Sequence, residues 1–152
     1  MNYGVYLDYN SLYALCLSAK LAYGIMIELN QKEVAEFKIN AVDCNGEFAY
    51  ALLVDISIPD AVKRKTDDLP LALYHKQIEY DDLSHYTKHL TSEINMKNFS
   101  HPCKKLVAGH EDQSDYLISL ELLQLLVELG VTVKRISRIF KFPQKEIFKE
   151  YI

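Results

Sequence analysis

The sequence contains no tryptophan, and only 5 glycines and 4 prolines occur among its 152 residues. So little glycine and proline excludes a long flexible linker. Cysteine is also scarce, and the 3 cysteines (Cys16, Cys44 and Cys103) show no C-x-x-C spacing. An odd number of widely separated cysteines predicts reduced thiols in an intracellular protein, not a disulfide framework.

Excess positive charge is missing as well. The 17 lysines and arginines face 21 aspartates and glutamates, which leaves a formal net charge of -4. Proteins that bind nucleic acid on their own are usually basic, because much of their affinity comes from neutralising phosphates. The balance therefore argues against an autonomous nucleic-acid-binding protein, but it permits a domain that concentrates carboxylates around metal ions.

No segment has the length and apolarity of a membrane-spanning helix. The most apolar stretch, residues 117–130, is interrupted by Glu121, Gln124 and Glu128, whereas about 20 mostly apolar residues are needed to cross a bilayer. Residues 1–10 have neither the basic nor the apolar region of a signal peptide. We therefore expect no membrane partner.

The residues that are present suit one domain with a hydrophobic core, since 49% are hydrophobic and 25% are charged. Apolar patterns predict strands at 3–8, 48–58, 104–109 and 131–142, and helices at 11–20 and 120–129, the second ending at Gly130. Two short strands are expected at 25–29 and 34–42, and an unfinished helix at 145–152. This order predicts an α+β fold, an antiparallel sheet backed by helices.

Two further features of the pattern concern connections. The alternation in 131–142 slips after Lys134, which is typical of a β-bulge. Residues 60–103 are interpreted as a loop-rich polar insert that carries the basic run 63–65 and a small hairpin around 76–80.

Asp8 is the residue whose position indicates chemistry. It stands at the end of the first predicted strand, directly before a helix N-terminus that Asn10 and Ser11 can cap. A carboxylate there can bind Mg²⁺, which prefers oxygen ligands and often also binds substrate phosphates. The same position also suits an aspartate that only caps the helix, and local chemistry leaves both interpretations open.

The residues D-Y-N-S-L-Y at 8–13 resemble motif A of family B DNA polymerases, D-x-x-S-L-Y-P. Further similarity follows in the family's order, namely D-D-L-P-L-A at 67–72, K-K-L-V-A-G at 104–109, the segment 116–142, and Phe142, Gln144, Lys149, Tyr151 and Ile152 at the end. These stretches are similar to the protein-primed polymerases of phages, adenovirus-like viruses and Maverick-type mobile elements. The resemblance covers nearly the whole chain and implies part of the polymerase palm.

The resemblance implies a role for each matching residue. Asp8 is expected to be the catalytic aspartate that binds both Mg²⁺ ions, with the backbone carbonyl of Tyr9 as a further ligand. Ser11 and Leu12 are expected to lie along the triphosphate of the incoming deoxynucleotide, and Tyr13 to exclude a 2′-hydroxyl beneath the sugar. The expected reaction is transfer of a nucleotide from a deoxynucleoside triphosphate to a primer 3′-hydroxyl on primer-template DNA.

Three basic clusters are candidates for DNA contact, and the resemblance favours only one. Lys134, Arg135 and Arg138, on a predicted strand, are expected to contact DNA phosphates. The clusters at 63–65 and 104–105 are interpreted as ordinary solvated charge. His85, His89, His101 and Cys103 are too irregularly spaced to predict a zinc site, and packing or surface roles are expected for them.

Departures from the family limit the expected activity. Ala14 stands where the motif has proline, and Ile147 where the family often has tryptophan. The 152 residues contain no K-x-x-x-N-S-x-Y-G fingers motif, no D-T-D motif with the second catalytic aspartate and no exonuclease D-x-E motif. We therefore expect an incomplete palm over residues 1–152, a fragment that is inactive without the fingers, thumb and exonuclease parts of a polymerase.

The expected location is intracellular, at the site of DNA replication, in the nucleus or the cytoplasm. Two alternatives remain open. One is a polymerase-derived domain that serves as a non-catalytic binding or regulatory protein. The other is an unrelated α/β interaction domain in which the downstream similarity arose by chance.

Overall fold

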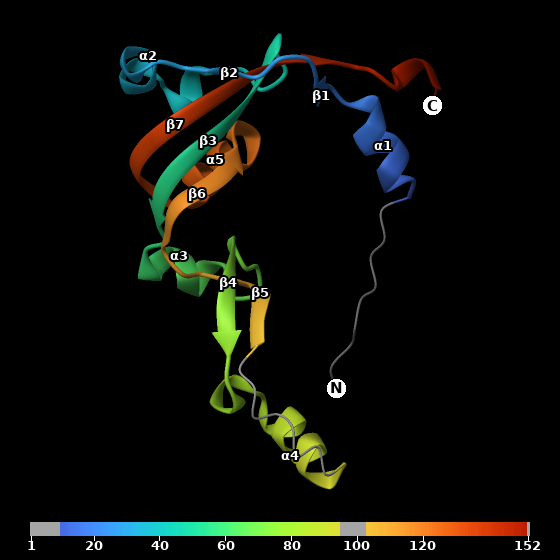
Figure 1. The fold of residues 1–152 in the computed structure, drawn as a ribbon, viewed down its shortest axis with the longest axis vertical. Coiled ribbons are helices and arrows are strands. Elements are labelled where there is room, and N and C mark those ends of the chain that lie inside the picture. The colour runs from blue at the N-terminus through green and yellow to red at the C-terminus, as the bar shows by residue number, and fades with distance from the viewer. Residues whose placement is uncertain (1–9, 95–102, 152) are drawn as a thin grey trace.

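The computed structural model of the chain describes residues 10–94 and 103–151 (Figure 1). It is a mixed α+β fold with antiparallel sheets and helices, as the sequence predicted. The helices are α1 (Leu12–Ser18), α2 (Gln31–Glu36), α3 (Asp60–Lys65), α4 (His85–Glu93) and α5 (Leu120–Leu129). The strands are β1 (Leu21–Ala22), β2 (Ile27–Glu28), β3 (Phe48–Ser57), β4 (Ala72–Ile78), β5 (Cys103–Gly109), β6 (Gln113–Ser119) and β7 (Thr132–Lys145). Short 3₁₀ turns cover Ile39–Ala41, Tyr80–Asp82 and Lys149–Tyr151.

The main sheet is built on β3 and β7, the two longest strands. Its order is β1-β7-β3-β6, β2 also pairs with β7, and all neighbours are antiparallel. β3 is rich in branched and aromatic residues that suit a half-buried strand, and it ends just before Pro59, as predicted. The predicted bulge in β7 is confirmed, because the β3–β7 register shifts between Leu53 and Val54 and again between Asp55 and Ile56.

Helix α5 covers one face of this sheet and creates the core (Figure 1). Leu123 and Leu126 of α5 are buried, as are Leu52, Val54 and Ile56, which alternate along β3. The helix ends at Gly130 as predicted, and Gly130 has φ 102, a left-handed conformation that glycine adopts without a steric penalty. The opposite face of the sheet, called the open face below, carries the intervening residues of β3.

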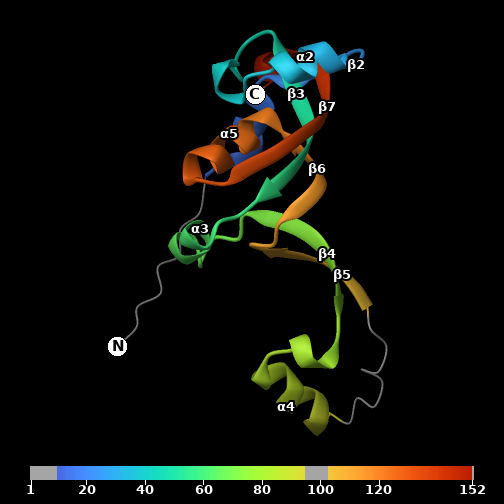
Figure 2. The same cartoon turned by 90° about the vertical axis from the view of Figure 1, so that its left-hand side faces the viewer.

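Strands β4 and β5 form a separate two-stranded ribbon, called the β4–β5 ribbon below. Their register runs from Ala72 opposite Gly109 to Ile78 opposite Cys103. The ribbon leaves the end of the main sheet next to α3 and leads toward α4 (Figures 1 and 2). The segment 60–103 thus holds more regular structure than the expected loop-rich insert, and the strand within it pairs with the next predicted strand instead of forming a small hairpin around 76–80.

Two local predictions are wrong. The strand expected at 34–42 is instead the end of helix α2 and a 3₁₀ turn. The helix forms because Asn30 and Glu33 make a capping box, with the Asn30 side chain accepting from Lys32 N and Glu33 N and the Glu33 carboxylate accepting from Asn30 N. At the C-terminal end, the expected helix is only the 3₁₀ turn Lys149–Tyr151.

Other predictions on the N-terminal segment divide in two. The predicted helix after Asp8 is present as α1, while the predicted strand at 3–8 lies outside the described residues.

Within residues 10–94 and 103–151, no helix is both long and apolar enough to cross a membrane.

Candidate active site and DNA-binding face

The predicted metal ligands, Asp8 and Tyr9, lie outside the residues that the structure describes. The described part of the motif begins at the N-terminus of α1. Ser11 has left-handed backbone angles, φ 57 and ψ 37, and its side chain caps no helix N–H. Its carbonyl oxygen accepts a hydrogen bond from Leu15 N at 3.0 Å. The Ser11 hydroxyl is therefore not used by the helix, and its predicted role toward a triphosphate stays a prediction.

Leu12 and Tyr13 are both exposed. The exposed fraction is 48% for Leu12 and 87% for Tyr13, and α1 has no buried residue. Helix α1 thus forms as predicted, but the described residues bury none of its side chains. Tyr13 has its whole ring available to a ligand, which fits the predicted contact with a sugar but does not by itself select one.

The three predicted DNA-contacting cations do come together, because β7 is bulged. Side chains of an unbroken strand alternate between faces, so Arg135 and Arg138 would point in opposite directions. Opposite Leu53 and Val54 of β3, strand β7 pairs through Arg138 and Ile136, which leaves Ser137 as an extra residue. The second shift leaves Lys134 unpaired in the same way. These bulges place both arginines on the open face.

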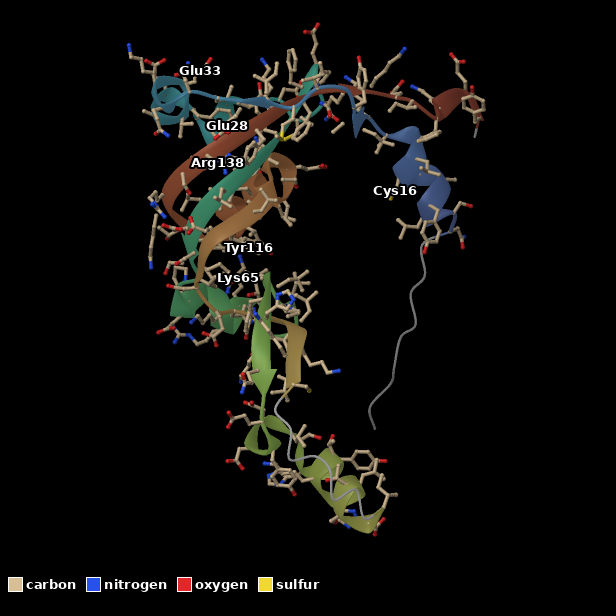
Figure 3. All side chains as sticks on the ribbon, viewed as in Figure 1. Cys16, Glu28, Glu33, Lys65, Tyr116 and Arg138 are labelled. Atoms are coloured by element: carbon tan, nitrogen blue, oxygen red, sulfur yellow. The ribbon has the colours of Figure 1, made fainter. Side chains whose placement is uncertain are left out.

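Arg138 is held on the open face by a bidentate ion pair (Figure 3). Its Nε and Nη2 atoms donate to the two Glu28 carboxylate oxygens at 2.7 and 2.8 Å. Its guanidinium carbon lies 4.8 Å from the centre of the Phe140 ring, a favourable cation–π distance. The hydrogen bond from Arg138 holds the pKa of Glu28 below its usual range, so this pair is ionised at neutral pH.

Arg135 bridges two carboxylates. Its Nε donates to Asp55 Oδ2 at 2.7 Å, and its Nη2 donates to Asp115 Oδ1 at 3.3 Å. The Asp115 backbone N–H donates to Asp55 Oδ1 at 2.9 Å, with Asp115 at φ 49. The hydrogen bond from Arg135, followed by that from the Asp115 backbone, lowers the pKa of Asp55.

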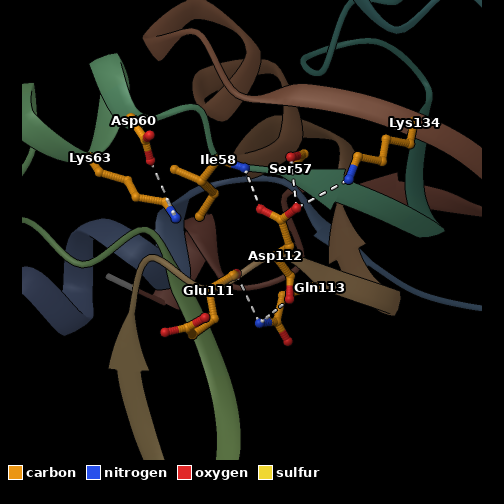
Figure 4. Close-up of polar contacts among 8 residues, drawn as sticks. All are labelled: Ser57, Ile58, Asp60, Lys63, Glu111, Asp112, Gln113 and Lys134. Carbon is orange, nitrogen blue, oxygen red and sulfur yellow. Dashed lines mark hydrogen bonds and ion pairs between the residues drawn. The ribbon is translucent and has the colours of Figure 1, made fainter.

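Lys134 contacts Asp112 at the end of the sheet next to α3 (Figure 4). Asp112 Oδ2 accepts from Lys134 Nζ at 3.1 Å and from Ser57 Oγ at 2.7 Å, while Oδ1 accepts from Ile58 N at 2.9 Å. These contacts lower the pKa of Asp112 to about 2, with the hydrogen bond from the Ile58 backbone as the largest cause, followed by those from Ser57 and Lys134.

The arrangement makes the open face electrostatically self-compensated. Each of Lys134, Arg135 and Arg138 already has a carboxylate partner. A DNA phosphate at this face would have to displace a carboxylate or share its cation, which costs part of the binding energy. That these residues contact DNA stays a prediction.

Candidate metal ligands can be tested in the same way. Residues 10–94 and 103–151 contain no group of three or more His, Cys, Asp or Glu side chains placed to hold a metal ion. The open-face carboxylates Asp55 and Asp115 do not suit Mg²⁺ as they stand, because the Arg135 guanidinium occupies their oxygens. His85 and His89 of α4 are both exposed. The Nε2 atom of His89 lies 3.8 Å from the Glu93 carboxylate.

The carboxylates that organise the open face were missed in the sequence. Only Asp55 had a local signal, since it alternates with Val54 and Ile56 in a predicted strand. Glu28, Asp112 and Asp115 pair with cations 110, 22 and 20 residues away, so strand pairing and not local pattern brings them into place.

The chain matches no family model, and neither the curated proteins nor the solved structures include a significant match to it.

Proposed function

We propose that this chain is part of a DNA-directed DNA polymerase of family B, the part of the palm that carries motif A. The observation that carries the proposal is the run D-Y-N-S-L-Y at 8–13. Similar stretches follow it in the family's order, at 67–72, 104–109 and 116–142. An antiparallel sheet with one helix-covered face and one open face is compatible with such a palm. The proposed location is inside the cell, at the site of DNA replication.

The proposed roles follow the motif. Asp8 would bind Mg²⁺ together with the Tyr9 carbonyl, Ser11 and Leu12 would lie along the triphosphate, and Tyr13 would contact the sugar. When bound, the metal ions would activate the primer hydroxyl and neutralise the phosphate oxygens. The freedom of the Ser11 hydroxyl from helix capping and the exposure of Tyr13 support these roles.

The motif supplies few oxygen ligands for a metal ion. Asp8 is the only acidic residue before Glu28, and a hard divalent ion usually requires several oxygen ligands. We expect a polypeptide of these 152 residues to bind Mg²⁺ weakly and to extend no primer, because one carboxylate does not fix two metal ions. Template-dependent primer extension by the pure polypeptide would contradict this expectation.

The experiment that tests the proposal is NMR titration with Mg²⁺ or Mn²⁺ and a deoxynucleoside triphosphate. Shifts or line broadening clustered at residues 8–13 are expected, and they should be lost in Asp8→Ala. Asp60→Ala is the matched control, because Asp60 also lies at a helix N-terminus and its side chain is 85% exposed. No response at about millimolar metal, a concentration at which even weak carboxylate sites fill, would contradict a retained half of a polymerase active site.

A second candidate function is a polymerase-derived domain that binds a partner without catalysis. The pairing of Lys134, Arg135 and Arg138 with carboxylates favours it, because a palm that holds primer-template DNA is expected to keep cations available for phosphates. The double variant Arg135→Gln/Arg138→Gln separates the two. Weaker primer-template binding at low salt would favour the polymerase, and unchanged binding would favour the non-catalytic domain.

A further inference from the structure

The β4–β5 ribbon is a basic element in an acidic chain. Each of its strands has seven residues, and together they carry Lys76, Lys104, Lys105 and His75 but no acidic residue. Most of its side chains are exposed on both faces, including Leu73 and Leu106. In a chain whose net charge is -4, this concentration of positive charge on one projecting element needs a physical explanation.

Two of the lysines lie directly opposite one another. Lys76 and Lys105 are cross-strand partners in the ribbon register, so their side chains emerge from the same face. Like charges at such a position destabilise a strand pair. Asp82 relieves only one of them, since its carboxylate contacts Lys76 Nζ at 2.6 Å. Within the described residues, neither Lys104 nor Lys105 has a carboxylate within ion-pair distance.

Lys104 and Lys105 thus differ from the cations of the open face. Lys134 and the two arginines of β7 are neutralised by carboxylates of the same sheet. Among residues 10–94 and 103–151, no carboxylate forms an ion pair with the two lysines of β5. An arrangement of this kind is expected where an anion from another molecule supplies the missing countercharge.

The ribbon is fixed firmly at its base. His110, directly after β5, contacts the carbonyl oxygens of Thr66 and Leu69 through Nε2 at 2.9 and 3.1 Å. Leu71 N donates to Gly109 O at 3.1 Å. The last turn of α3, residues 63–65, is basic and lies beside this base (Figure 2), where Lys63, Arg64, Asp67 and His110 line a hollow.

We propose that the β4–β5 ribbon binds duplex DNA, with Lys104 and Lys105 as its phosphate contacts. A two-stranded antiparallel ribbon has the dimensions to enter the major groove of B-form DNA, and lysines on its faces then reach the phosphates on either side. Charge complementarity selects a polyanion, and the choice of duplex DNA among polyanions rests on the proposed polymerase function. The basic turn 63–65 lies beside the base of the ribbon, where Lys63 Nζ is 3.9 Å from the Asp60 carboxylate and Asp67 lines the same hollow.

The test is the affinity of the full chain for a fluorescent DNA duplex, measured by anisotropy across a salt series. Lys104→Gln/Lys105→Gln is expected to weaken binding by about tenfold or more at low salt and to make the slope of log K against log salt shallower by about 2. The control is Lys32→Gln/Lys38→Gln, which removes the same charge from exposed positions in and after α2, at the opposite end of the molecule. The control is expected to keep the wild-type slope.

A second measurement excludes simple misfolding. Lys105→Gln removes the like-charge pair with Lys76, so its free energy of unfolding without DNA should equal or exceed that of the wild type while its DNA affinity falls. Equal loss of affinity in the ribbon and control variants, no duplex binding by the wild type, or equal binding to heparin and duplex would each overturn the proposal. None of these outcomes bears on metal and nucleotide binding at residues 8–13, so a failed ribbon and a failed polymerase assignment are distinguishable.

Discussion

Asp112 connects the end of β3, the residue that follows it and strand β7 through hydrogen bonds. It lies between β5 and β6 and accepts hydrogen bonds from Ser57 Oγ, Ile58 N and Lys134 Nζ. Charge-assisted hydrogen bonds are stronger than neutral ones, but this carboxylate is 48% exposed and solvent screens it. Asp112→Asn is therefore expected to lower the free energy of unfolding by roughly 1 kcal/mol at neutral pH, as measured by urea denaturation.

The pH dependence of that effect follows from the pKa of Asp112. The carboxyl has a pKa of about 2 in the folded chain and an ordinary value of 3.8. Because the folded pKa is depressed, the stabilisation is fully present above pH 3.8 and is lost as the pH falls to about 2. The difference between wild type and Asp112→Asn should fall to about half at pH 3. Asp60→Asn, whose partner Lys63 is 3.9 Å away, should show little effect at either pH.

For the open-face cations, the sequence predicted the residues but not their partners. Lys134, Arg135 and Arg138 were predicted to contact DNA phosphates from one strand, and the slip in alternation predicted the bulge that brings the two arginines to one face. Their carboxylate partners were not predicted, because Glu28 and Asp115 reach β7 only through pairing in the folded sheet. A local pattern reports which face a side chain occupies, whereas charge compensation depends on which strands become neighbours.

At the scale of the element, helix α2 depends on its N-terminal cap. Its six residues include only one buried side chain, Val34, so packing contributes little and the capping box contributes much of its stability. Asn30→Ala is expected to lower the free energy of unfolding by about 1 kcal/mol. Asn30→Ser should lower it much less, because serine also caps a helix N-terminus. Asn40→Ala, a change at another exposed asparagine, inside the 3₁₀ turn Ile39–Ala41 and away from any helix N-cap, is the control. Loss of protection from hydrogen exchange in residues 31–36 would locate the effect, and equal stability of Asn30→Ala and wild type would contradict it.

The elements that sequence predicted best are those whose own pattern defines them. Strand β3 alternates buried and half-buried residues, and α5 has an apolar face closed by Gly130. Helix α2 was missed although its signal, Asn30 followed by Glu33, is present in the sequence, because the flanking branched residues favoured strands. The β4–β5 pairing was missed for another reason, since α4 and its flanking segments separate the two strands and periodicity does not report such long-range partners.

At the scale of the whole molecule, stability is concentrated in the sheet and α5. Leu123 of α5 is fully buried in the same core cluster as Leu52 of β3 and Ile139 of β7. Leu123→Ala is expected to lower the free energy of unfolding by roughly 2–5 kcal/mol, since it removes buried methyl groups and leaves a cavity. Leu122→Ala, at a residue of α5 that is 43% exposed, should cost less than about 1 kcal/mol. Equal costs at the two positions would contradict the placement of the core.

The β4–β5 ribbon should open independently of that core. All seven residues of β4 pair with β5, but the one buried residue of the described ribbon, Ala72, lies at the base next to buried Leu71. Few apolar contacts favour local opening. Native-state hydrogen exchange should therefore show weaker protection for the amides of Tyr74 to Ile78 than for those of β3. Leu123→Ala should accelerate exchange in β3 and β7 while leaving the distal ribbon unchanged, because the ribbon already exchanges through a smaller opening. Equal acceleration in both regions would mean that the ribbon unfolds only with the core, and in that case a bound DNA duplex would stabilise the entire fold and not the ribbon alone.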